Sequence, residues 1–170
     1  MTPVNRNETQ GSGSTPESPD LELLSFRVAD QEYSVDIMSV REIRSWTRAT
    51  SLPHAPEFVR GVINLRGAVL PVVDLGIRLG ISSGEPNERS VIIVVDLGSR
   101  SVGLRVDAVS DILSIPRSEL QTPPDLLSEQ SEAFIRALTI VEGRMIRVLD
   151  LMAVLPPATV SATLTAPVAA

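Results

Sequence analysis

The stretch GAVLPVVDL, residues 67–75, returns 76 residues later as GRMIRVLDL, residues 143–151. A second pair of segments, VDIMSVREI at residues 35–43 and LRVDAVSDI at residues 104–112, is related by a shift of 69. The difference between the two shifts predicts a longer loop in the second half of the chain, at residues 118–132. We interpret the chain as two copies of one unit that complete each other's core, with a groove between them where partners would bind.

The repeated unit is rich in short strands. Four pairs of apolar segments with many β-branched residues flank turn residues and predict four hairpins. They are residues 23–29 with 32–37, 62–65 with 69–73, 91–97 with 102–106, and 135–141 with 145–149. Few segments have the period of a helix, so we predict a mainly β protein built as barrels or a sandwich. Pro71 lies inside the second hairpin and predicts an edge strand or a bulge there.

The composition argues against several classes of function. The 170-residue chain has a net charge of −6, and its 15 basic residues are all arginine. An acidic chain without a basic block is a poor binder of nucleic acid and of anionic lipid. The chain has no cysteine, which excludes disulfides and thiolate chemistry. No apolar run resembles a signal peptide or a membrane span, so we predict a cytoplasmic protein without direct membrane insertion.

The chain divides into three parts. Residues 1–20 are rich in Ser, Thr, Pro and Gly and predict a disordered leader. Residues 156–170 show no apolar pattern and predict a flexible tail. The repeat fills residues 21–155, which we interpret as one domain made of two pseudo-repeated subdomains.

No set of residues predicts catalysis. Asp74 and Asp150 occupy equivalent places in the two copies, as in an aspartic protease, but neither is followed by the Thr-Gly of such an enzyme. Each aspartate is predicted instead to cap a short helix. His54, the single histidine, lies between two prolines in a predicted exposed loop, and a lone His without Cys suits neither a triad nor a metal site. We therefore predict no enzyme activity, no metal and no cofactor.

Two charged clusters remain as candidate binding residues. Glu42 lies among apolar residues on a predicted strand, and Arg66 lies at a tight turn where Gly67 supplies a positive φ. The simpler alternative is that both are solvated surface charges, because most surface ion pairs contribute under ~1 kcal/mol. Trp46, the single tryptophan, can be a core residue or an interface anchor.

Taken in order, several motifs resemble the CheW family of chemotaxis adaptors over residues 21–155. They are EYSVDI (32–37), VREI (40–43), FVRGVINLRG (58–67), PVVDL (71–75) and VGLRVDAVSDI (102–112). The resemblance implies two intertwined SH3-like five-stranded β-barrels, with strands exchanged around a shared core and a few short helices. It also implies a non-enzymatic scaffold that binds the cytoplasmic tip of methyl-accepting chemoreceptors and the regulatory domain of the histidine kinase CheA, at membrane-associated arrays.

The resemblance also assigns residues to surfaces. The receptor surface would contain Glu42 and Arg66, with Val40, Gly61 and Val91 as apolar and close-approach neighbours. The kinase contact is predicted at one end of a barrel, in the loop formed by Trp46, Thr47 and Arg48. Two alternatives stay open: a CheW-like adaptor of a non-flagellar pathway that controls surface motility or a second messenger, and a barrel that binds a small ligand or oligosaccharide. The second alternative has little support, because only 3 % of the residues are aromatic and could stack on a ligand.

Overall fold

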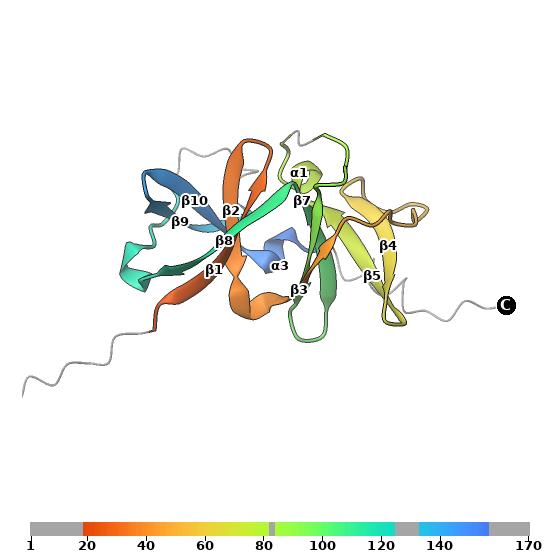
Figure 1. Cartoon of the computed structure of the whole chain (residues 1–170), viewed down its shortest axis with the longest axis horizontal. Coiled ribbons are helices and arrows are strands. Elements are labelled where there is room, and N and C mark those ends of the chain that lie inside the picture. Colours follow the sequence, from red (N-terminus) through yellow and green to blue (C-terminus); the bar gives the residue numbers. More distant parts are fainter. Residues whose placement is uncertain (1–18, 82–83, 125–132, 157–170) are drawn as a thin grey trace, which may run out of the picture.

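The computed structural model describes residues 19–81, 84–124 and 133–156. Within these ranges the chain forms two five-stranded β-sheets that stand beside one another (Figure 1). The predicted leader and tail fall almost entirely outside the described ranges, as does much of the predicted loop at residues 118–132. None of the described helices is long and apolar enough to cross a membrane.

The two sheets are named sheet A and sheet B. Sheet A has the spatial order β8 (Ala108–Ile115), β1 (Leu21–Val28), β2 (Gln31–Asp36), β10 (Arg144–Leu149) and β9 (Ile135–Val141). Sheet B has the order β3 (Val40–Ser45), β6 (Val91–Asp96), β7 (Ser101–Val106), β5 (Ala68–Asp74) and β4 (Val59–Leu65). The short helices are η1 (Ile37–Ser39), α1 (Leu75–Arg78), η2 (Arg117–Glu119) and α3 (Leu151–Val154).

Each sheet is built from both copies of the sequence repeat. The first copy runs from β1 to α1 and the second from β6 to α3, but the first two strands of each copy join the last three strands of the other. Two parallel pairings make this exchange, β2 with β10 and β5 with β7. The prediction of two intertwined SH3-like units of five strands, with a few short helices, is confirmed.

Neither sheet is closed into a full barrel by strand pairing in the part of the chain that the structure describes. In sheet B the segment after edge strand β3 reaches edge strand β4 through one bridge, in which Thr50 and Val62 exchange two backbone hydrogen bonds of 2.8 and 2.9 Å. Gln121 and Leu138 form the matching bridge in sheet A, with both distances 2.8 Å. Each unit is therefore an open sheet whose two edges are joined by one backbone bridge.

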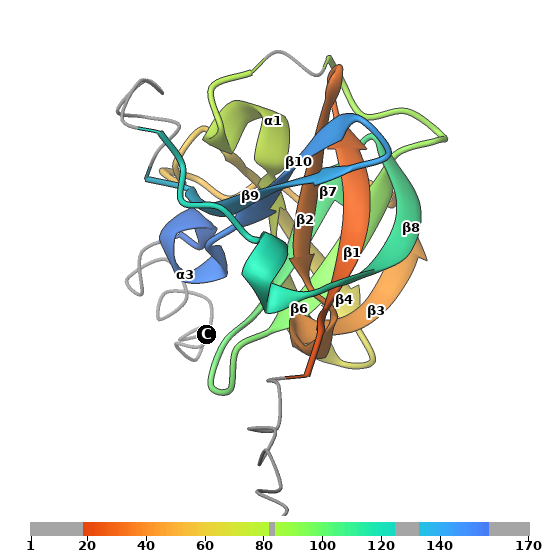
Figure 2. The same ribbon diagram turned by 90° about the vertical axis from the view of Figure 1, so that its left-hand side faces the viewer.

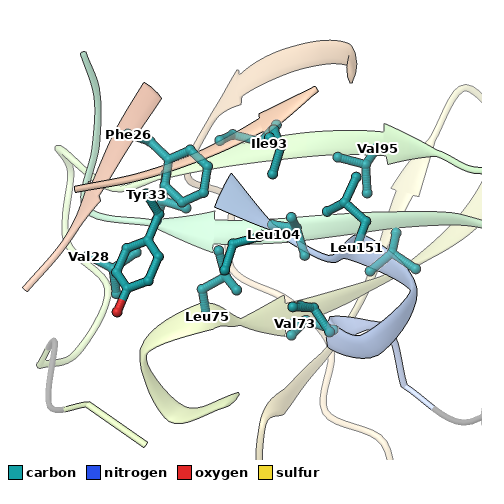
Figure 3. Close-up of a cluster of buried hydrophobic side chains, with 14 of the residues drawn as sticks. Phe26, Val28, Tyr33, Val73, Leu75, Ile93, Val95, Leu104 and Leu151 are labelled. Atoms are coloured by element: carbon teal, nitrogen blue, oxygen red, sulfur yellow. The ribbon is translucent and has the colours of Figure 1, made fainter. Parts of the chain in front are cut away.

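The largest apolar core lies between the two sheets. Phe26 and Tyr33 of sheet A stack with ring centroids 6.4 Å apart, and Ile93 and Leu104 of sheet B belong to the same cluster (Figure 3). Two smaller clusters fill the individual sheets, around Leu23 in sheet A and Ile92 in sheet B. Leu23 and Ile92 are equivalent under the shift of 69, so equivalent residues of the two copies occupy corresponding places in the apolar clusters of the two sheets.

The predicted turns and caps are confirmed. All four predicted hairpins form, and the turns Arg66-Gly67 and Glu142-Gly143 both have two successive positive φ angles. Two positive φ angles define the type I′ turn, whose twist matches that of antiparallel strands. Asp74 accepts a hydrogen bond from the Ile77 N–H and caps α1, and Asp150 caps α3 in the same way.

The expectation for Pro71 needs a correction. Its strand β5 is internal, paired with β4 on one side and β7 on the other. The β5–β7 ladder begins only at Val72, opposite Gly103, and the β4–β5 register shift lies between Val59 and Gly61 rather than at Pro71. A proline has no N–H to donate, and here it stands just before the second ladder starts. A proline within a strand can therefore lie where the pairing with one neighbouring strand stops, as well as on an edge strand.

Candidate partner-binding site

Glu42 and Arg66 meet across the open seam of sheet B. Glu42 lies on edge strand β3, whereas Arg66 lies in the β4–β5 turn at the opposite edge of the sheet. The Nη2 of Arg66 donates to Oε2 of Glu42 at 2.6 Å, and Nη1 of Arg44 donates to Oε1 at 3.1 Å. One guanidinium therefore holds each oxygen of the carboxylate. The structure brings together the two residues that the sequence singled out, and their pairing ties the two edges of the sheet.

The local turn chemistry fixes the position of Arg66. Arg66 has a φ of 52° and Gly67 a φ of 85°, and the Gly67 N–H donates to Oδ1 of Asn64 at 2.9 Å. A non-glycine residue adopts positive φ only where the surroundings hold it. The turn formed by Asn64-Leu65-Arg66-Gly67 therefore directs the Arg66 side chain towards β3.

The two arginines also set the charge of Glu42. The hydrogen bond from Arg44, followed by the hydrogen bond and charge of Arg66, lowers the pKa of the Glu42 carboxyl. Glu42 is consequently ionised at neutral pH. Because the Arg66 side chain is 67 % exposed, the pair fixes geometry and charge pattern rather than adding much stability.

An apolar rim lies on the side of the molecule that carries β3 and β8, away from α1 and α3 (Figure 2). We define it by five residues that are exposed or only partly buried: Met38, Val40, Ile43, Val109 and Ile112. Val40 and Val109 pack against the shared core, and Ile43 and Ile112 pair across their strands with members of that core. Of these five residues, only Val40 was predicted from the sequence to belong to a binding surface. The repeat alignment offered the signal for the others, since Ile43 and Ile112 are equivalent.

Gly61 and Val91 lie away from the Glu42–Arg66 pair. Val91 pairs with Ser45 at one end of β3, whereas Val40 pairs with Val95 at the other end. Gly61 is buried, and a Cβ there would lie 2.1 Å from the carbonyl oxygen of Thr50. Contact within the chain thus accounts for this glycine. A role of Gly61 or Val91 in receptor binding stays a prediction.

The predicted kinase loop follows β3 directly. Thr47 and Arg48 are exposed, whereas Trp46 is partly buried and packs against the apolar cluster of sheet B. Trp46 and Arg48 line a pocket of about 380 Å³, together with Ala49, Ser51, Arg60, Glu85 and Pro86. Trp46 therefore packs against the core of sheet B and also lines a surface pocket, and the exposed Arg48 lies in the wall of the same pocket.

A buried charge cluster under this pocket was missed by the sequence analysis. Asp74 is completely buried, and its Oδ2 accepts from Nε of Arg60 at 2.8 Å and from Nη1 of Arg105 at 3.5 Å. Burial alone would lower the pKa of Arg60, but its hydrogen bond and charge interaction with Asp74, together with those from Glu85, outweigh burial and raise that pKa. Nothing in one sequence signals that Arg105, in an apolar strand, pairs with an aspartate 31 residues earlier.

The Glu42–Arg66 pair and the apolar rim both present side chains that another protein can contact. No group of three or more His, Cys, Asp or Glu side chains in residues 19–81, 84–124 and 133–156 could hold a metal ion. The charged residues at the seam are paired with one another, and the apolar rim carries no nucleophile. Such a surface suits protein recognition, in which apolar contacts supply affinity and charges select the partner.

Two intertwined SH3-like sheets, with a charged seam beside an apolar rim, define a class of β-sheet protein whose surface suits protein recognition. Residues 22–158 match the family model of the CheW-like domain, and the chain belongs to this family. It is 56 % identical over 135 residues to the chemotaxis protein CheW of Rhizobium meliloti (strain 1021), covering 79 % of this chain and 87 % of that protein.

More distant relatives and a solved structure agree with this assignment. The chemotaxis protein CheW of Bacillus subtilis (strain 168) is 31 % identical over 133 residues, covering 78 % of this chain and 85 % of that protein. The crystal structure of the scaffolding protein TtCheW from Thermoanaerobacter tengcongensis superposes with a TM-score of 0.75 at 29 % identity. This superposition covers 86 % of this chain and 95 % of TtCheW. The chain is a chemotaxis scaffold of the CheW family.

Proposed function

We propose that this protein couples the cytoplasmic tip of methyl-accepting chemoreceptors to the regulatory domain of the kinase CheA. It works in the cytoplasm, at receptor arrays, and performs no catalysis. The observation that carries the proposal is the Glu42–Arg66 pair, whose glutamate lies on β3, the edge strand that also carries Val40 and Ile43 of the apolar rim. Membership of the CheW family supports the choice of partners.

The receptor contact follows from the two kinds of surface on β3. An apolar rim accepts the apolar face of a helical hairpin, because burying that face in a groove is a common mode of helix recognition. Glu42 and Arg66 then fix the register and exclude wrong partners more than they add affinity. Their mutual hydrogen bond holds both side chains in place before the partner arrives, which reduces the entropic cost of binding.

The kinase contact uses the other end of the same strand. β3 runs from Val40 at the rim to Ser45, and Trp46, Thr47 and Arg48 follow it directly. Six strand residues span about 20 Å, so one rigid strand links both surfaces. In an array, many such weak contacts add up through effective concentration.

The test is kinase activation in a reconstituted mixture of receptor, CheA and this protein. We expect the wild type to activate autophosphorylation and Arg66→Glu to reduce activation several-fold, because a second carboxylate would face Glu42. Arg27→Glu makes the same charge change on β1, where the arginine is exposed, and should behave as the wild type. A folded wild type that leaves the kinase unaffected would reject the proposed coupling.

A further inference from the structure

A small pocket opens beside the charged seam of sheet B. We name it the Arg41–Arg66 pocket, after the two arginines in its wall. Its volume is about 170 Å³, and its other lining residues are Leu65, Ala68, Val69, Leu70, Val94 and Ser101. Leu65, Leu70 and Val94 are buried members of the apolar cluster of sheet B and form an apolar lining. At ~30 Å³ per water molecule the pocket holds roughly six waters, which is the room needed by one side chain.

A β-bulge turns Arg41 towards this pocket. The β3–β6 register shifts between Val40 and Glu42, so Arg41 is the extra residue of the edge strand. Successive strand residues normally point to opposite faces, and a bulge breaks this alternation and re-aims a side chain. As a result Arg41 lines the pocket, and Glu42 pairs across the strands with Val94, another of its lining residues.

The pocket carries unbalanced positive charge. Arg44 and Arg66 are both engaged by the single carboxylate of Glu42. Arg41 is exposed and has no ion-pair partner among the residues that the structure describes. Near the pocket, three arginines therefore stand against two carboxylates, Glu42 and Asp96, and Asp96 lies opposite the lining residue Ser101 across the strands. The charge that complements this region is negative.

The arrangement is specific to sheet B. Under the repeat, Arg41 corresponds to Ser110 and Arg66 to Glu142, so the matching place in sheet A has no arginine pair. Arg144, which stands where sheet B has Ala68, instead donates from Nη1 to Oε1 of Glu32 at 2.5 Å. Sheet A thus forms without an arginine pair at the equivalent place.

We propose that the Arg41–Arg66 pocket receives one glutamate side chain of the chemoreceptor's helical hairpin. The methylene stem packs on Leu65, Leu70 and Val94, and the carboxylate accepts hydrogen bonds from Arg41. A glutamate fits because it joins an aliphatic stem to a negative tip, matching an apolar lining with a cationic wall. The receptor is the partner because the pocket shares Arg66 with the seam pair, so this inference rests on the proposed function.

The test is binding of a receptor cytoplasmic hairpin fragment, measured by calorimetry with the full chain. We expect Arg41→Glu to weaken binding about tenfold, with a loss that shrinks as salt is raised. The matched control Arg27→Glu should bind within about twofold of the wild type. Ala68→Phe, which fills the pocket without changing charge, should weaken binding as well. Urea unfolding of each variant verifies that the fold is intact.

Charge reversal on the receptor identifies the partner residue. Each glutamate of the hairpin tip is replaced by arginine in turn, and one replacement should restore binding to Arg41→Glu while weakening binding to the wild type. The inference is overturned if Arg41→Glu and Arg27→Glu bind equally, or if Arg41→Glu loses only CheA binding. A wild type that fails to bind the receptor at all would instead reject the proposed function.

Discussion

Gly61 shows how one residue can depend on a distant part of the chain. Its φ is 140°, and its Cα faces the Thr50 carbonyl, which accepts the hydrogen bond from Val62 that ties the edges of sheet B. The equivalent residue in sheet A, Ala137, carries a Cβ at a position that is also buried. The sequence shows a glycine before Val62, but the requirement for it comes from a loop eleven residues earlier, which no local pattern reveals.

Gly61→Ala should destabilise the protein strongly. The new Cβ would collide with a backbone oxygen that cannot move without breaking the Thr50–Val62 bridge, and we expect a loss of about 2–4 kcal/mol. The matched variant Ala137→Gly adds only backbone freedom and a small cavity, so about 1 kcal/mol is expected. Urea unfolding of both variants measures the difference. Equal losses would show that the bridge relaxes around the added methyl group.

The titration of Glu42 tests how Arg44 and Arg66 stabilise its ionised carboxylate. Since its pKa in the folded protein lies below the ordinary value of 4.5, the interaction is present above that pH and is lost as the pH falls through the lowered value. Arg44→Gln removes the largest cause of the shift and should raise the pKa of Glu42 towards 4.5. Side-chain carboxyl NMR of the wild type and Arg44→Gln measures this, and an unchanged pKa would assign the effect to Arg66 alone.

At the scale of secondary-structure elements, the local signals of the sequence were reliable. The four hairpins follow from turn dipeptides flanked by β-branched runs, and both helix caps follow from an aspartate after a strand. Which strands pair with one another was harder to predict from the sequence. Pro71 suggested an edge strand, yet β5 is internal, because the order of strands depends on partners from the other copy. The contact between Glu42 and Arg66 likewise depends on how the two edges of a sheet curve together.

The two helix caps should differ sharply in their effect on stability. Asp150 caps α3 from an exposed position, so Asp150→Ala should cost about 1 kcal/mol. Asp74 caps α1 but is also fully buried against Arg60 and Arg105, and removing one partner of a buried ion pair costs about 3–5 kcal/mol. Denaturant unfolding of Asp74→Ala and Asp150→Ala compares the two sites directly. Similar losses would mean that water replaces the missing carboxylate of Asp74.

At the scale of the whole molecule, the exchange of strands makes the two sheets interdependent. Neither copy of the repeat forms a sheet alone, since β1 and β2 pair with strands of the second copy and β6 and β7 with strands of the first. The apolar core between the sheets contains residues of both copies, so it is a second interaction that holds the copies together. The sequence repeat predicted two units that need one another, whereas the exchange itself came from the family resemblance, because a repeat is equally compatible with two separate sheets.

Arg78 provides a third connection, and it breaks the symmetry of the repeat. Its guanidinium lies 4.2 Å from the ring centroid of Phe58 and 4.9 Å from that of Phe134, two residues that are equivalent under the shift of 76. It also donates to the carbonyl oxygens of Val154 and Ala153, both at 3.1 Å, and so caps α3 from α1. Burial lowers the pKa of Arg78, yet an arginine keeps its charge in proteins. The equivalent position in the second copy is Val154, so the single arginine Arg78 contacts the equivalent phenylalanines of both copies.

Arg78→Met should loosen the second copy more than the first. Methionine keeps an apolar stem between the two rings but loses two charged hydrogen bonds and the cation–π contacts, for which we expect about 2–3 kcal/mol. Amide hydrogen exchange should accelerate most in α3, whose last carbonyls lose their donors, whereas β1 should open only with global unfolding. Arg27→Met, at an exposed position on β1, is the control. If α3 exchanges as slowly in Arg78→Met as in the control, the shared core and the exchanged strands alone hold the two copies together.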